Sequence, residues 1–218
     1  MHILFMFILL LLPCMALAEE GITSKPSIDR SEAIKLRKIE NARQFEENKA
    51  KAEQGDAEAQ ALVGSAYIFT NGGVVQRDLA EAEKWLMKSA DQGNVTGQVL
   101  AGLLYSGNVG NASDLRDYSK ALRLFEKAAW QGEPRAYDKL AFMYYNGQGV
   151  QKDKIESLKW LCLAIKAYNA PPHKDAGSRM ALSGVFFDIF EKLSPEEVAE
   201  ARKRADVWEA ALASKQSK

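Results

Sequence analysis

The chain has 218 residues, of which 47% are hydrophobic, with 29 basic and 29 acidic side chains. This length suffices for one well-packed domain or for an elongated array of repeats. The zero net charge argues against a nucleic-acid binder, because such a protein needs a basic excess to displace counterions.

The first 18 residues have the pattern of a secretory signal peptide. Ile3 to Leu12 is an apolar run too short to span a bilayer as a mature helix, and Ala16-Leu17-Ala18 is a small-x-small cleavage pattern. Pro13 precedes Cys14, where a lipoprotein anchor needs a small residue. We therefore expect cleavage after Ala18 and a mature chain in the periplasm, with secretion from the cell as the second choice. We expect no integral membrane segment in the mature chain.

Residues 19–51 are expected to form a tether followed by a charged capping helix. The stretch from Ser31 to Lys51 is rich in charge and has few apolar positions, among them Phe45. Its composition favours one long helix that leads into the next segment.

Residues 52–168 repeat one pattern three times. Gln-Gly pairs stand at 54–55, 92–93 and 131–132, and each is followed at fixed spacings by small residues, a tyrosine, a glycine and a large side chain. The recurring positions are Gly55, Tyr67, Gly72 and Trp85, then Gly93, Tyr105, Gly110 and Leu124, then Gly132, Tyr144, Gly149 and Trp160.

This spacing predicts a pair of helices in each unit. Small and aromatic residues 4, 8, 9 and 12 positions after the glycine share one side of a helix, which allows a second helix to approach closely. Glycines near positions 15 to 17 end the first helix. Asp78, Asp117 and Asp153 are suitable N-caps for the second helix. A period of this length predicts a solenoid of stacked helix pairs.

Residues 169–218 are expected to form a proline-bounded loop and C-terminal capping helices. Pro171-Pro172 interrupts the chain, and a helix is expected from about Gly177 to Lys192. Ser194 is expected to cap a final helix, with Glu197 completing a capping box.

The repeated pattern resembles the Sel1-like repeat, a relative of the tetratricopeptide repeat. The residues that carry the resemblance are the spaced Gly, Ala, Gly and Tyr, the turn "NGQGV", the Asp, and "KSADQG" or "KAAWQG". It covers about residues 52–168 and implies an all-α solenoid of about three stacked hairpins with N- and C-terminal capping helices. The second unit departs from the pattern with a longer turn and Leu124, and the third with Ala141 and Ser157.

The same resemblance implies function through protein binding. Exported proteins of this kind resemble inhibitors or immunity proteins that neutralise a cognate envelope-acting toxin or enzyme. A scaffold or regulator of signalling, polysaccharide export or host contact stays open as the alternative. Cysteine-rich members of the family are described as β-lactamases, but they carry a disulfide pair in each repeat, which this chain lacks.

The residues themselves give little support to catalysis. After removal of Cys14 with the signal, Cys162 and His173 are the only cysteine and histidine, and Cys162 is expected to be buried. The chain contains no GxSxG, GxxxxGK[ST] or HExxH motif. We therefore expect no catalytic residue, no cofactor and no metal. Several glutamates are expected to point outward and pair with Lys84, Lys127 and Lys159: Glu81, Glu83, Glu126 and Glu156.

Apolar residues also stand where the repeat pattern leaves the first helices free. These positions predict a partly apolar groove for a protein partner. The alternative is that neighbouring helices cover them. The candidate partner-binding residues are Ile68, Phe69, Val99, Leu103, Phe142 and Tyr145.

Overall fold

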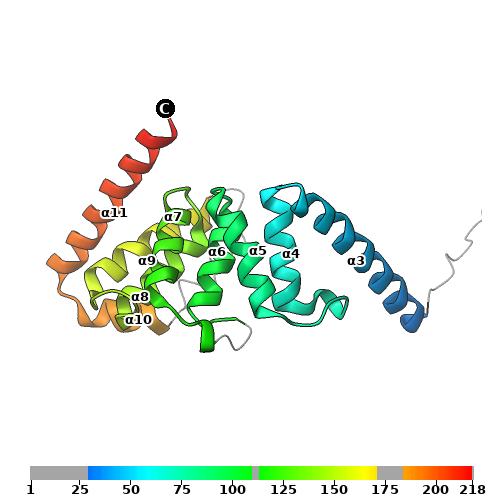
Figure 1. Cartoon of the computed structure of the whole chain (residues 1–218). Coiled ribbons are helices and arrows are strands. Elements are labelled where there is room, and N and C mark those ends of the chain that lie inside the picture. Colours follow the sequence, from blue (N-terminus) through cyan, green and yellow to red (C-terminus); the bar gives the residue numbers. More distant parts are fainter. Residues whose placement is uncertain (1–28, 110–112, 171–183, 218) are drawn as a thin grey trace, which may run out of the picture. The chain divides into compact units, whose positions relative to one another are not determined.

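The computed structural model describes residues 29–109, 113–170 and 184–217 (Figure 1). Contacts divide the chain into two units, Met1–Ile39 and Glu40–Lys218. Helix α3 (Arg30–Glu53) begins in the first unit, where the side chains of Ile34 and Ile39 are exposed. The second unit contains the rest of α3 and all the other described helices. The expected signal peptide, His173, Pro171-Pro172 and Gly110 lie outside the described residues.

In the second unit, six helices form three consecutive hairpins. The first helices are α4 (Ala57–Phe69), α6 (Val95–Tyr105) and α8 (Pro134–Asn146), and the second helices are α5 (Leu79–Asp91), α7 (Tyr118–Ala129) and α9 (Lys154–Asn169). Each helix contacts the next along this row, and α4 also contacts α6 (Figure 1). Short 3-10 turns, η1 (Thr70–Gly72) and η2 (Ser113–Leu115), lie between the helices of the first two hairpins. No strand occurs among the described residues, which confirms the predicted all-α solenoid.

The helix starts follow from local side-chain chemistry. Asp78, Asp117 and Asp153 accept backbone N–H hydrogen bonds at the starts of α5, α7 and α9, as predicted. Asp56 and Asn94 perform the same role for the first helices α4 and α6. Glu133 caps α8 by accepting from the N–H of Arg135, and Pro134 stands in the first turn. Both helices of each hairpin therefore have capped starts.

Glycines end the helices and allow them to approach. Gly55, Gly93 and Gly132 have left-handed backbone angles, which a side chain rarely adopts. After α6, Gly107 takes the left-handed conformation, and Gly110, the glycine expected in this turn, lies outside the described residues. Inside α6, a Cβ atom on Gly102 would stand 2.7 Å from the ring of Phe125. The small residue thus lets α7 pack closely on α6.

The large recurring side chains fill the space between helices. Trp85, Leu124 and Trp160 are all buried, so Leu124 replaces the aromatic ring without leaving the core. Tyr105 is buried, whereas Tyr67 and Tyr144 are half-buried. Ala141 and Ser157, the departures in the third unit, are both buried, and the Ser157 hydroxyl donates to the carbonyl of Ala141 at 2.7 Å.

A ladder of glutamine side chains ties the turns between hairpins to the first helix of the preceding hairpin. Gln92 in the first turn donates to the buried Gln60 of α4 at 2.7 Å. Gln131 in the next turn donates to the buried Gln98 of α6 at 2.9 Å. In the third repeat the place of these buried glutamines is taken by Tyr137, which stacks on Trp160. These hydrogen bonds hold the turn after a hairpin against the first helix of that hairpin, because a buried amide is costly to leave unpaired.

Helix α3 has the sequence position of a second helix but not its apolar face. In α5 and α7, the side chains 4, 7, 8 and 11 residues before the glycine are buried. The corresponding residues of α3 are polar: Lys51, Asn48, Glu47 and Gln44. Phe45 and Ala52 instead pack on α4, with the Phe45 ring edge-on to Tyr67 at 5.9 Å.

Two helices follow the third hairpin in the described residues. Helix α10 (Gly184–Lys192) corresponds to the C-terminal part of the helix expected over residues 177–192, whose first residues lie outside the described range. Helix α11 (Pro195–Gln216) packs on α9. Ser194 and Glu197 form the predicted capping box at the start of α11. Both hydrogen bonds are present, from Glu197 N–H to Ser194 and from Ser194 N–H to Glu197.

Candidate interaction surface

The first helices carry apolar side chains at equivalent outward positions. Counted from the glycine of each Gln-Gly pair, these are positions 7, 10 and 14. Phe69 is 56% exposed, and Leu62 and Phe142 are each 41% exposed. Leu100 and Leu103 are half-buried. We call these five side chains the first-helix face. Positions 7, 10 and 14 lie on one side of a helix, and apolar side chains exposed together on one side are typical of a contact surface.

Two of the residues that the sequence assigns to this face lie elsewhere. Ile68 and Val99 are 1% and 0% exposed and belong to the main apolar core. Each stands one residue before an outward position, which turns its side chain by about 100° around the helix. Because α4 and α6 lie beside each other, that direction is covered by neighbouring helices. Their placement on an exposed face is therefore wrong.

Tyr145 is also engaged within the chain. It is half-buried, and its hydroxyl donates a short hydrogen bond to the carboxylate of Asp188 in α10. Lys192 forms an ion pair with the same carboxylate, and this contact, followed by the Tyr145 hydroxyl, holds the pKa of Asp188 below its usual range. Tyr145 therefore ties α8 to α10, and this contact occupies the hydroxyl that a partner would otherwise use.

Four carboxylates expected on solvated faces have different surroundings. Glu81 pairs with Lys84 at 2.8 Å, as expected. Glu83 instead accepts a hydrogen bond from the Tyr105 hydroxyl at 2.6 Å. Glu126 is half-buried, and burial raises its pKa although nearby Lys159 and Arg123 act to lower it.

The fourth carboxylate, Glu156, forms an ion pair that is largely removed from water. It pairs with Lys159 at 2.6 Å, and Lys159 is buried, which corrects the expected solvated position of that lysine. Arg204 of α11 also reaches Glu156 at 3.3 Å. A buried cation needs such partners, because an uncompensated charge in the interior is strongly destabilising.

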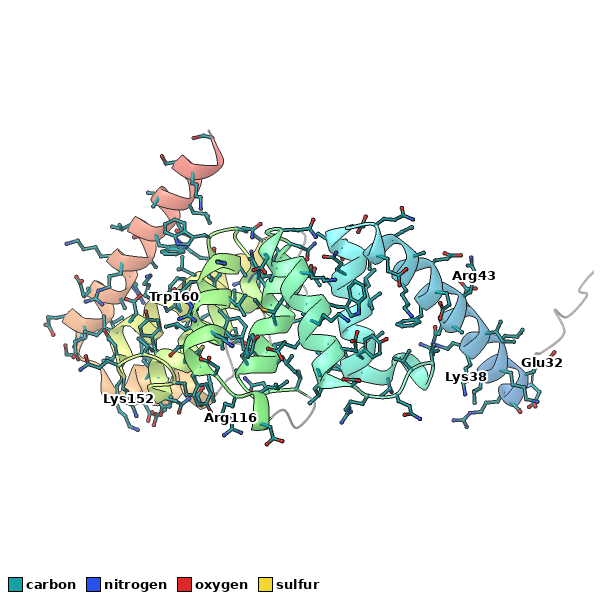
Figure 2. The ribbon with its side chains drawn as sticks, in the orientation of Figure 1. Glu32, Lys38, Arg43, Arg116, Lys152 and Trp160 are labelled. Carbon is teal, nitrogen blue, oxygen red and sulfur yellow. The ribbon has the colours of Figure 1, made fainter. Side chains whose placement is uncertain are left out.

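An aromatic cluster surrounds Lys159 where α11 meets the third repeat. The rings of Trp130 and Trp208 lie 3.9 Å apart, and Trp160 meets Trp208 edge-on at 4.7 Å. The Lys159 ammonium lies 4.1 Å from the centre of the Trp160 ring. A cavity of about 440 Å³ opens beside this cluster, partly lined by Arg204. The repeat pattern gives no signal for this cluster, since Trp130 and Trp208 fall outside the repeat positions. Figure 2 labels Trp160 and shows side chains gathered around it.

Groups able to do chemistry are sparse in the described part of the chain. No three His, Cys, Asp or Glu side chains within it could hold a metal ion together. Cys162 is half-buried rather than buried, and burial raises the pKa of its thiol, which disfavours the reactive thiolate. No helix among the described residues combines the length and the apolar character needed to span a bilayer.

The three hairpins coincide with matches to a known family. The Sel1 repeat family matches residues 57–94, 101–133 and 134–169. This chain is a Sel1-repeat protein. Its Sel1 repeats identify it as a protein-binding module, because these repeats form an interaction scaffold.

Named relatives share the Sel1 region over part of their length. The ERAD-associated E3 ubiquitin-protein ligase component HRD3B of Arabidopsis thaliana is 31% identical over 125 residues, which are 57% of this chain and 19% of the relative. The protective antigen c5321, present in uropathogenic Escherichia coli strains, has an SLR fold. It is 30% identical, with a TM-score of 0.51, over 75% of this chain and 34% of that structure.

A Sel1 repeat protein from Oxalobacter formigenes is 32% identical, with a TM-score of 0.48, over 74% of this chain and 42% of the other. The Sel1-repeat chain described here therefore spans about a fifth of the curated relative and less than half of each similar structure.

Proposed function

We propose that this Sel1-repeat protein is exported, is not an enzyme, and binds one cognate protein through the first-helix face. The observation that carries the proposal is the exposure of Leu62, Phe69 and Phe142 on the first helices, at positions 7, 14 and 10 of their units. Truncating a central apolar anchor of an interface typically costs about 2 kcal/mol or more of binding. Several such side chains on one face supply the energy for a specific contact.

The most concrete form of this proposal is an inhibitor or immunity-type protein that neutralises an envelope-acting toxin or enzyme. The predicted export signal supports an envelope location, and the similar c5321 is a bacterial antigen with the same kind of fold. An inhibitor needs a binding surface but no reactive group, which agrees with the surroundings of Cys162. The target is an exported protein encoded beside the gene for this chain.

A second candidate function is a periplasmic scaffold or regulator of signalling, polysaccharide export or host contact. The relative HRD3B supports it, since that protein is a component of a larger ligase. Co-expression with neighbouring genes separates the two candidates. An inhibitor should restore growth to cells that express a toxic protein from a neighbouring gene. A scaffold should copurify with the product of a neighbouring gene and leave the activity of that product unchanged.

The binding surface is tested by the double substitution Leu103→Asp with Phe142→Asp. We expect it to weaken capture of the cognate protein by at least about 30-fold, the equivalent of one lost anchor. A matched control is Val207→Asp, an apolar residue of α11 that is exposed outside the first-helix face. Melting curves of all variants must overlay that of the parent protein.

Two outcomes contradict the proposal. Capture that survives the double substitution places the interface elsewhere. Capture that is lost only in Val207→Asp assigns it to the cavity beside the aromatic cluster, which Val207 partly lines.

A further inference from the structure

The row of first helices has an open place at its N-terminal end. A shallow cavity of about 180 Å³ lies between α3 and α4. Phe45, Val63 and Ala66 form its apolar floor, and Leu62 and Phe69 stand beside it. All of these residues belong to the unit that starts at Glu40.

The internal repeat indicates what kind of element fits this place. In the second hairpin, the equivalents of Leu62 and Ser65 are Leu100 and Leu103 of α6, which are half-buried. Helix α4 lies beside α6. Leu62 and Phe69 of α4 are exposed by comparison. Among the described helices, none takes the place beside α4 that α4 takes beside α6.

The polar side of the cavity narrows the chemistry of the occupant. A helix placed beside α4 in this way would also face α3. It would contact the positions of α3 that correspond to the buried positions of α5 and α7, which pack on their own first helices. In α3 those positions include Gln44 and Asn48, which line the cavity. The occupant must therefore be apolar toward α4 and carry hydrogen-bonding groups toward α3.

We infer that this cavity is a docking site for an amphipathic α-helix of a partner protein, which continues the row of first helices by one. The inference rests on the proposed function, since it names the part of the partner that binds at one end of the first-helix face. Its energetic basis is that of a helix laid into an apolar groove, read by residues spaced three and four apart. The same packing is already present between α4 and α6.

The chain itself supplies a probe. A peptide of residues 57–69, labelled and held helical by a cross-link between positions 58 and 62, reproduces the helix that packs beside α6. Both cross-linked positions are exposed in α4, so the cross-link leaves the packing sides free. Fluorescence anisotropy with the exported, purified protein should show saturable binding of one peptide.

The paired substitution Leu62→Glu with Phe69→Glu should weaken peptide binding by at least about 30-fold, since it places two charges in the groove. Both side chains are exposed, so we expect the variant to fold, and its melting curve verifies this. The matched control Val207→Glu changes an exposed apolar residue of α11, outside the first-helix face, and should bind the peptide like the parent protein.

Several outcomes overturn the inference. One is a peptide that does not bind, and another is binding that is unaffected by the paired substitution. A third is sedimentation of the protein as a dimer that the same substitution converts to monomer, because a second copy would then occupy the groove. If the peptide fails while Phe142 is still needed for capture of the cognate protein, only this inference fails. If the peptide binds but no cognate protein is captured, the docking site stands and the proposed function fails.

Discussion

Gly102 lies in α6 where the ring of Phe125 from α7 packs against it. The Phe125 ring occupies the space that a methyl group would need. The third repeat has Ala141 at the same position, and it is fully packed. One position of the repeat therefore holds side chains of different volume in different units.

This difference predicts that Gly102→Ala destabilises the protein by about 1–3 kcal/mol through overpacking. Alanine favours a helix over glycine by up to about 1 kcal/mol, so an increase in stability would be expected without the clash. Chemical denaturation measures the change. The reciprocal substitution Ala141→Gly should also destabilise, since it removes a buried methyl group. A Gly102→Ala protein more stable than the parent would show that the Phe125 ring moves aside freely.

Two glutamates should respond to pH in opposite directions. Burial raises the pKa of Glu126, so the fold favours its protonated form. That contribution to stability is present below the unfolded pKa of about 4.3 and is lost as the pH rises through the folded pKa. Glu126→Gln should therefore increase the free energy of unfolding at pH 7 and have little effect near pH 3.5.

Glu196 supplies the contrast. Its own backbone N–H in the first turn of α11, and next the Ser194 hydroxyl, hold its pKa below the usual range. Its contribution is present above the unfolded pKa and is lost as the pH falls through the folded pKa. Glu196→Gln should decrease stability at pH 7. Urea denaturation at both pH values measures the free energy of unfolding. A change of the same sign at pH 7 in the two variants would contradict the surroundings described for these two glutamates.

At the scale of the element, helix starts could be predicted from the sequence, because capping is local. An Asp before a helical run needs only the N–H groups two or three residues later, as Asp117 illustrates. Which side of each first helix is exposed was harder to predict from the sequence than where the helix starts. Whether Val99 or Leu100 faces outward depends on where the neighbouring helix lies, and one residue of offset decides it.

The aromatic cluster shows the same limit over a longer distance. Trp130 and Trp208 are separated by the whole third repeat, by α10 and by part of α11, so their contact has no signal in the repeat pattern. The burial of Lys159 follows from this contact, because α11 brings Trp208 and Arg204 over it. A residue that looked solvated in its own helix is covered by another.

Helix α11 should therefore depend on Trp208 for its docking. We expect Trp208→Ala to increase hydrogen exchange throughout residues 195–216, since the helix loses its contacts with Trp130 and Trp160. Exchange in α4 and α5 should stay unchanged, because each unit of a solenoid contacts only its neighbours. Val207→Ala, at an adjacent exposed residue, is the control. A global rise in exchange after Trp208→Ala would argue for one cooperative unit instead.

At the scale of the whole molecule, the processed N-terminus is a prediction of its own. Cleavage after Ala18 should give a mature protein that starts at Glu19 and fractionates with the periplasm. N-terminal sequencing and cell fractionation measure this. Retention of Met1, or a lipid on Cys14, would contradict it. Every binding experiment should therefore use the mature chain that starts at Glu19.

The glutamine ladder has a consequence for how this chain can change in length. A duplicated second repeat would bring its own Gln98 and Gln131, so every hydrogen bond between turns and first helices would still form. A duplicated third repeat has Tyr137 in place of the acceptor and no glutamine in the turn after α9. Growth by tandem duplication is therefore accommodated in the middle of the array and opposed at its C-terminal end, where aromatic packing has replaced the amides.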